Sequence, residues 1–165
     1  MPASPEPRPR VLILGGTAEA AALAERLVAD GRSDVVSSLV GATRQRRALA
    51  GALRVGGFGG ARGLAAYLVA EDITRVVDAT HPFAATISRH AAMASDRSGL
   101  PLLRLERLAW RPQSDDRWIE VRDAAAAAEA LPSLADRVFL TIGRKEIAAF
   151  AGRPETWFLV RLIEA

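Results

Sequence analysis

The sequence predicts an α/β fold: a Rossmann-like doubly wound parallel sheet followed by the start of a second, smaller α/β domain. Short apolar runs such as RVLIL and ITRVVD alternate with longer segments whose apolar residues recur at helical spacing. The runs are continuously apolar, as in strands covered on both faces, and parallel strands need crossover connections, usually helices. Half of the 165 residues are hydrophobic, which is enough for a packed core.

The first domain is predicted over residues 10–107, as a cofactor-binding domain in which strands and helices alternate. Strands are expected over residues 10–14, 35–41, 53–55, 73–80 and 100–106. Helices are expected over residues 20–30, 45–53, 61–72 and 82–98. Thr80 or His81 is expected to cap the last of these helices. Pro82 then lies in its first turn, where a missing amide costs nothing.

The strand and helix pattern restarts after a connector over residues 108–117, which is rich in charge and contains a proline. Strands are expected over 118–123, 137–144 and 157–165, and helices over 124–131 and 145–152. About three strands make less than an independent domain usually has, so residues 118–165 are expected to be a partial, truncated second domain. The free edge of its last strand favours association into a homodimer. Residues 1–9, polar and rich in proline, are expected to be a disordered tail.

Composition excludes several classes of protein. The chain has no cysteine, so disulfides and thiolate metal sites are excluded, and two histidines make a zinc site improbable. The first residues do not resemble a secretory signal, and no apolar run approaches the roughly 20 residues of a membrane-spanning helix, so a cytoplasmic protein is expected. The net charge is +3 and the arginines are scattered, which argues against nucleic-acid binding.

The loop after the first strand, LGGTAEA, carries the first candidate site. Ligands of open parallel sheets bind outside the carboxyl ends of the strands. Gly15 and Gly16 allow a phosphate to approach the backbone closely, and Thr17 can cap a helix whose free amides face an anion. The motif is not GxGxxG, and a glycine pair before a helix also occurs in ordinary turns. Glu19 either stabilises the helix dipole or accepts a hydrogen bond from a hydroxyl.

The second strand is followed by GATRQRR, which lacks the acidic residue that binds the ribose of NAD. It offers Thr43 and Arg44 instead, with Arg46 and Arg47 close behind. Arginine suits a 2′-phosphate, so the loop favours NADPH. A solvated basic turn explains the same residues equally well.

The stretch VVDATHPFA places His81 just after the end of a central strand. A histidine is more often structural, but this position directs it into the ligand crevice, where it would contact cofactor or substrate. A later loop, TIGRKE, repeats the order of strand, glycine and helix. Arg144 and Lys145 at its helix start make a second plausible anion site, although an ordinary turn fits as well.

Several motifs taken in order, ILGGTAEAAALAERL, RVGGFGGARGLAAYL, VVDATHPFAATIS, PLLRLERLAW and RVFLTIGRKEIAAF, resemble the precorrin-6A reductase family of cobalamin biosynthesis. The resemblance implies an oxidoreductase that uses NADPH to reduce a double bond of the precorrin-6A macrocycle, with no metal. It implies a catalytic residue, His81, and arginines that bind the substrate's carboxylates: Arg104, Arg107 and Arg144. The implied cofactor site comprises Gly15, Gly16, Thr17, Ala18, Glu19, Gly41, Thr43, Arg44, Thr80, Pro82, Phe83, Gly143, Arg144 and Lys145.

The sequence departs from the family pattern at three points. Leu108 replaces a proline, and Ala42 replaces a basic residue, so the contact to the 2′-phosphate would pass to Arg44. Family members also continue well past residue 165, with a further loop facing the cleft. Two other functions are open: a non-catalytic nucleotide-binding module, and an enzyme like the short-chain dehydrogenases and epimerases. The latter need a lysine four residues after a tyrosine, where this chain has Glu71 after Tyr67.

Overall fold

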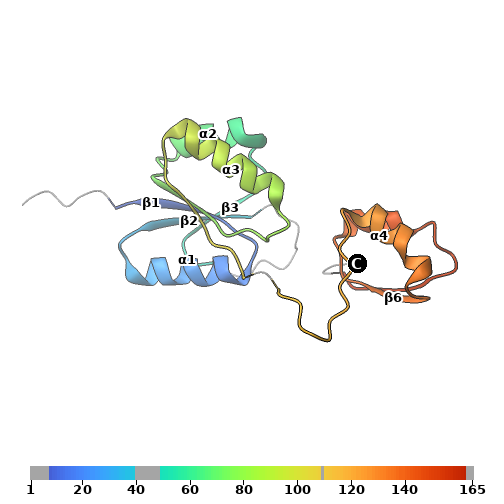
Figure 1. Ribbon diagram of the computed structural model, residues 1–165. Coiled ribbons are helices and arrows are strands. Elements are labelled where there is room, and N and C mark those ends of the chain that lie inside the picture. The colour runs from blue at the N-terminus through green and yellow to red at the C-terminus, as the bar shows by residue number, and fades with distance from the viewer. Residues whose placement is uncertain (1–7, 40–48, 109, 163–165) are drawn as a thin grey trace, which may run out of the picture. The chain divides into compact units, whose positions relative to one another are not determined.

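The computed structural model describes residues 8–39, 49–108 and 110–162, and the chain divides into two compact units, Met1–Ala109 and Trp110–Ala165 (Figure 1). Each unit is an α/β assembly with its own core. The expected disordered tail lies almost wholly outside the described residues. In the part of the chain that is described, no helix is long and apolar enough to cross a membrane.

The described residues of the first unit form a five-stranded parallel sheet in the order β3-β2-β1-β4-β5. Its strands are β1 (Arg10–Leu14), β2 (Asp34–Leu39), β3 (Ala52–Val55), β4 (Arg75–Asp78) and β5 (Leu102–Arg104). Its helices are α1 (Ala18–Asp30), α2 (Gly60–Ala70) and α3 (Ala85–Ser98). This is the doubly wound arrangement that the alternating pattern predicts, so the predicted fold class is confirmed.

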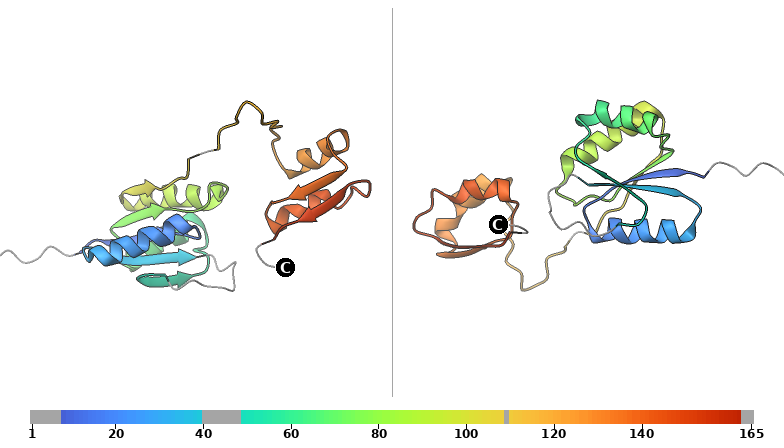
Figure 2. Two further views of the ribbon diagram at one scale, coloured as in Figure 1. Left: turned by 90° about the horizontal axis from the view of Figure 1, so that it is seen from below. Right: turned by 180° about the vertical axis from the view of Figure 1, so that it is seen from behind.

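Helices cover both faces of this sheet (Figures 1 and 2). Alternate residues of a strand point to opposite faces, so Leu12 and Leu14 of β1 pack with α2 and α3, whereas Val11 and Ile13 pack with α1. The α2 and α3 side contains a cluster of buried residues: Leu12, Leu14, Val36, Leu64, Leu68, Ile73, Val76, Ala91 and Ala94. Burial on both faces explains why the strands read as continuous apolar runs.

The described residues of the second unit contain two parallel strands, β6 (Arg137–Leu140) and β7 (Trp157–Val160). Helix α4 (Ala124–Ala130) and two 3₁₀ helices, η1 (Leu131–Ser133) and η2 (Arg144–Phe150), accompany them. The core of this unit consists of Ala128, Leu140 and Phe150. Asp123 caps α4, since its side chain accepts a 2.8 Å hydrogen bond from the amide of Ala126.

The strand predicted over residues 118–123 is wrong. This segment forms no strand, and the apolar side chains of Trp118, Ile119 and Val121 are 44–58% exposed. An alternating apolar run becomes a strand only where a neighbouring strand takes its backbone hydrogen bonds, and no described strand pairs with this one. The helix expected over 145–152 is the 3₁₀ helix η2, which begins one residue earlier and ends at Phe150.

The helix predicted over residues 45–53 is also wrong in its described part. Leu49, Ala50 and Gly51 are not helical, and β3 begins at Ala52. Gly51 has a φ of 83°, and a Cβ atom there would lie 2.6 Å from the carbonyl oxygen of Val35. At Gly51 the chain therefore passes too close to β2 for a residue with a side chain.

The start of α3 differs from the prediction as well. The helix begins at Ala85 with Ala84 at the N-cap, so neither Thr80 nor His81 caps it and Pro82 precedes it. The amide of Ala84 donates a 2.8 Å hydrogen bond to the carbonyl oxygen of His81, which closes a turn over residues 81–84. The Thr80 hydroxyl donates instead to Asp78, and this bond removes it from the capping role.

The close approach of Gly63 in α2 to the backbone of Phe58 can be tested by substitution. A Cβ atom at position 63 would overlap the carbonyl oxygen of Phe58. Gly→Ala in a helix usually stabilises by about 0.5–1 kcal/mol, but here we expect Gly63→Ala to destabilise the chain by about 1–3 kcal/mol. Chemical denaturation measures the effect. Gly57→Ala, where a Cβ meets open space, is the control and should stay within about 0.5 kcal/mol. A Gly63→Ala chain as stable as the wild type would contradict this packing.

Candidate functional site

The strand order reverses between β1 and β4, and the loops after these two strands lie at the same edge of the sheet. From β1 the chain moves to β2 through α1 on one face, whereas α2 and α3 lead to β4 and β5 on the other face (Figure 2). In open α/β sheets this switch point opens a crevice for ligands at the carboxyl ends of the strands. The fold therefore brings residues 15–19 and 79–83 together.

The loop after β1 is built around Thr17. Its hydroxyl accepts a 3.1 Å hydrogen bond from the amide of Ala20, which caps α1, and donates a 2.8 Å bond to the carbonyl oxygen of Ala79. Gly16 has a φ of 115°, a conformation that residues with a Cβ rarely adopt, and the space beside it is open. The predicted cap by Thr17 is confirmed, and the loop leaves backbone accessible at the α1 N-terminus.

Glu19 in the first turn of α1 binds Arg107, which follows β5. Arg107 Nε lies 2.6 Å from Glu19 Oε1, and Nη2 lies 2.8 Å from Oε2, so the contact is bidentate. The hydrogen bond from Arg107 is the largest cause that lowers the pKa of the Glu19 carboxyl below its ordinary value of 4.5. Sequence reasoning had assigned these residues to cofactor and substrate respectively. It missed the contact because they are 88 positions apart.

Asp78, which the sequence analysis did not single out as a site residue, ends β4 as a buried carboxylate with 2% of its surface exposed. Its Oδ1 accepts hydrogen bonds from the amide of Thr80 at 3.1 Å and from the Thr80 hydroxyl at 2.6 Å. The Thr80 hydroxyl oxygen also lies 3.4 Å from that of Ser88. Asp78 therefore fixes the turn that leads to His81. The signal for it was available, since an acidic residue that ends an apolar strand needs a partner.

The turn after Thr80 presents His81 and Phe83 at the surface. His81 is exposed, its Nδ1 accepts a 3.3 Å hydrogen bond from the amide of Phe83, and the two rings lie 5.2 Å apart. Phe83 is 91% exposed, and Pro82 between them is half-buried. An exposed imidazole beside an exposed aromatic ring belongs to no core, so these side chains are free to contact a ligand.

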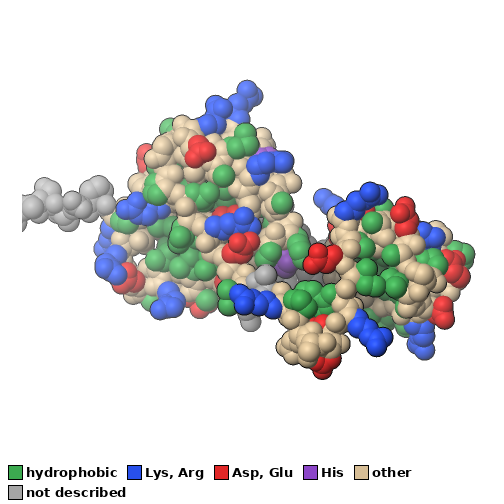
Figure 3. Space-filling view, in the orientation of Figure 1, with side chains coloured by type: hydrophobic (Ala, Val, Ile, Leu, Met, Phe, Trp, Pro, Cys, Tyr) green, Lys and Arg blue, Asp and Glu red, His purple; other side chains and the backbone are tan. Residues whose placement is uncertain are grey.

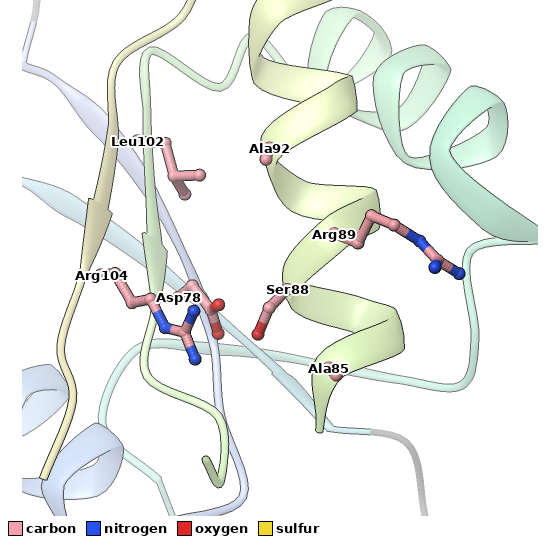
Figure 4. Close-up of a pocket in the computed structure, with 7 residues that line it drawn as sticks. All are labelled: Asp78, Ala85, Ser88, Arg89, Ala92, Leu102 and Arg104. Carbon is pink, nitrogen blue, oxygen red and sulfur yellow. The ribbon is translucent and has the colours of Figure 1, made fainter. Parts of the chain in front are cut away.

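A cavity of about 330 Å³ opens beside Asp78, between β4, β5 and α3 (Figure 4). The side chains of Asp78 and Ser88 point toward each other across it, whereas that of Arg89 points away. Arg104 lines the cavity from β5 and binds Glu106 through a 2.9 Å ion pair. The remaining lining residues are Ala85, Ala92 and Leu102. Both β5 and α3 thus contribute polar and apolar side chains to the lining.

The other predicted site residues belong to the second unit or lie outside the described residues. Gly143 precedes η2, and Arg144 and Lys145 are exposed at its start, all in the second unit. Gly41, Thr43 and Arg44 lie outside the described residues. Among the residues that are described, no group of three or more acidic or histidine side chains could hold a metal ion.

Charge on the surface is mixed. On the face shown in Figure 3, arginine and lysine side chains are interspersed with acidic ones and form no continuous stripe. Basic side chains therefore contribute individually, where the fold places one of them at a site. Arg107, which pairs with Glu19 of α1, is an example.

Comparisons with known proteins agree on one family. The model of the family described as "Precorrin-6x reductase CbiJ/CobK" matches residues 10–165. The chain is 50% identical to a precorrin-6A reductase of Rhodococcus erythropolis over 94% of this chain and 62% of that protein. It is 46% identical to a precorrin-6A reductase of a Sinorhizobium species over 95% of this chain and 60% of that one.

A solved structure described as CobK precorrin-6A reductase has the same fold, with a TM-score of 0.87 and 44% sequence identity. That match covers 95% of this chain and 62% of the solved chain. The chain thus spans less than two thirds of the length of these relatives. Because the family model matches nearly the whole sequence, the chain belongs to the precorrin-6x reductase CbiJ/CobK family.

Proposed function

We propose that this protein takes part in cobalamin biosynthesis as an NADPH-dependent reductase of precorrin-6A. The observation that carries the proposal is a doubly wound sheet, in a chain of this family, with a glycine-rich loop at its switch point that leads into α1 through the N-cap Thr17. The relatives are named for the reduction of precorrin-6A. The proposal assigns the same substrate to this chain, which covers about three fifths of their length.

The residues at the switch point fit a dinucleotide. The hydroxyl and carbonyl oxygens of Thr17 accept hydrogen bonds from the amides of Ala20 and Ala21, and the Glu19 amide bonds its own carboxylate. The amide of Ala18 is left for an anion. Open space beside Gly16 allows a diphosphate to approach the backbone. When bound, NADPH supplies a hydride to one carbon of the macrocycle double bond, and a proton is added to the neighbouring carbon.

Roles follow for the residues around the loop. Gly15, Gly16 and Ala18 present backbone to the diphosphate, and His81 and Phe83 contact the nicotinamide or the macrocycle. Gly41, Thr43 and Arg44 would bind the ribose and its 2′-phosphate. The exposed Arg144 and Lys145 of the second unit would bind substrate carboxylates or phosphate. A cytoplasmic location and a homodimer stay predictions.

The test of the function is oxidation of NADPH by the protein in the presence of precorrin-6A. We expect NADPH consumption to match formation of a product that has gained a hydride and a proton. Binding of NADPH without any turnover would favour the non-catalytic binding module instead. Absence of binding to NADPH and NADH alike would contradict both functions.

Cofactor choice is the first prediction from this assignment. No carboxylate follows β2 in the sequence, whereas Thr43 and Arg44 do, so NADPH should bind more tightly than NADH. Arg44→Ala should weaken NADPH binding about tenfold and leave NADH binding unchanged, because only NADPH carries the 2′-phosphate. Isothermal titration with both cofactors measures this, with Arg26→Ala on α1 as the control. Equal affinities for the two cofactors in the wild type would refute it.

His81 supplies the second prediction. Its side chain is exposed, so His81→Ala should change the free energy of unfolding by less than about 0.5 kcal/mol. Reduction of precorrin-6A should nevertheless slow, because the imidazole lies in the turn at the switch point. Thermal denaturation and the NADPH oxidation assay are run on the same preparation, with His90→Ala at a half-buried position of α3 as the control. Lost stability with normal turnover would mean that His81 is structural.

A further inference from the structure

The ion pair between Glu19 and Arg107 joins two segments that meet only through the fold. Glu19 lies in the first turn of α1, and Arg107 lies three residues beyond the end of β5. The amide of Leu105 donates a 2.8 Å hydrogen bond to the carbonyl oxygen of Asp78, so the chain after β5 is held at the carboxyl end of β4. From there Arg107 reaches α1, and its guanidinium binds both carboxylate oxygens of Glu19.

Glu19 poses an electrostatic problem for a cofactor at this helix. Its pKa is lowered, first by the hydrogen bond from Arg107 and then by its own backbone amide, so the carboxylate is ionised at neutral pH. A diphosphate bound at the amide of Ala18 would lie beside the residue that carries this negative charge. Like charges repel, more weakly at this partly exposed position than in a buried one, but enough to weaken the binding of an anion. A site for an anion with an uncompensated Glu19 would therefore be weakened by its own helix.

We propose that Arg107 is a positioning residue of the cofactor site, the counter-charge that neutralises Glu19 so that a dinucleotide diphosphate can bind at the N-terminus of α1. This rests on the proposed function, since it takes a nicotinamide dinucleotide as the ligand. Arg107 acts through Glu19, with two of its five N–H donors engaged in the bidentate contact. The pair is thus assigned to the cofactor, and Arg107 is moved from the substrate-binding set in which the resemblance placed it.

Arg104 and Arg32 also form ion pairs, but neither pairs with a carboxylate in the first turn of α1. Arg104 binds Glu106, two residues along the same segment. Arg32 binds Asp30 at the opposite end of α1, with Nε 2.7 Å from Oδ2. This second pair is a matched control, because it too joins an exposed arginine to a carboxylate of α1, but at the end of the helix remote from the switch point.

The experiment is titration of the intact 165-residue chain with NADPH and with NADH. Arg107→Ala should weaken both cofactors about tenfold, because both carry the diphosphate that an unpaired Glu19 would repel. Adding Glu19→Gln in the same chain should restore affinity to within about threefold of wild type, since the uncompensated charge is then gone. Arg107→Lys should retain most of the affinity, and Arg32→Ala should bind as wild type. The defect of Arg107→Ala should shrink at high salt.

The outcomes separate this inference from the proposed function. A wild-type chain that binds neither cofactor overturns both. If the wild type binds but Arg107→Ala binds equally well or more tightly, the inference alone falls. If the double variant stays as weak as Arg107→Ala, the arginine does not act by neutralising Glu19, and the inference also falls. Melting temperatures of all variants are compared, and a defect that tracks lost stability instead of the charge at position 19 counts against it.

Discussion

The hydroxyl of Thr17 holds the candidate site together. It donates to the carbonyl oxygen of Ala79 and accepts from the amide of Ala20, so one side chain joins the end of β4 to the start of α1. The amide of Ala79 in turn donates to the carbonyl oxygen of Leu14 at the end of β1. Because the strand order reverses between β1 and β4, these bonds close the base of the crevice while the amide of Ala18 at the start of α1 stays available.

Two carboxylates shape the surroundings of this crevice: Asp78, which is buried, and Glu19, which is paired with an arginine. Asp78 uses its buried oxygen to fix Thr80 and thereby the turn that carries His81. Glu19 is partly exposed and would oppose an anionic ligand on its own, but the chain after β5 brings Arg107 to it. The dinucleotide account therefore depends on where the fold brings charges together, and the net charge of +3 says little about it.

The sequence predicted the sheet well, because continuous apolar runs mark strands covered on both faces, and these recur between helical segments. It failed where a local pattern lacked its tertiary partner: the run at Trp118 to Val121 has no described neighbouring strand, and Thr80 binds Asp78 instead of capping α3. The role of the glycines before α1 could be predicted from the sequence, because it depends only on the local backbone. The contact between Glu19 and Arg107 was not, because it depends on the path of the chain after β5.

The central claim is that a nicotinamide dinucleotide binds at the carboxyl ends of β1 and β4. The most direct measurement follows the backbone amide signals of the chain by NMR as NADPH is added. The account predicts that shifts concentrate at Gly16, Thr17, Ala18 and Glu19 and at Ala79 to His81, with little change at Asp30 and Gly31 at the far end of α1. Shifts that spare the first turn of α1 while others move would contradict it.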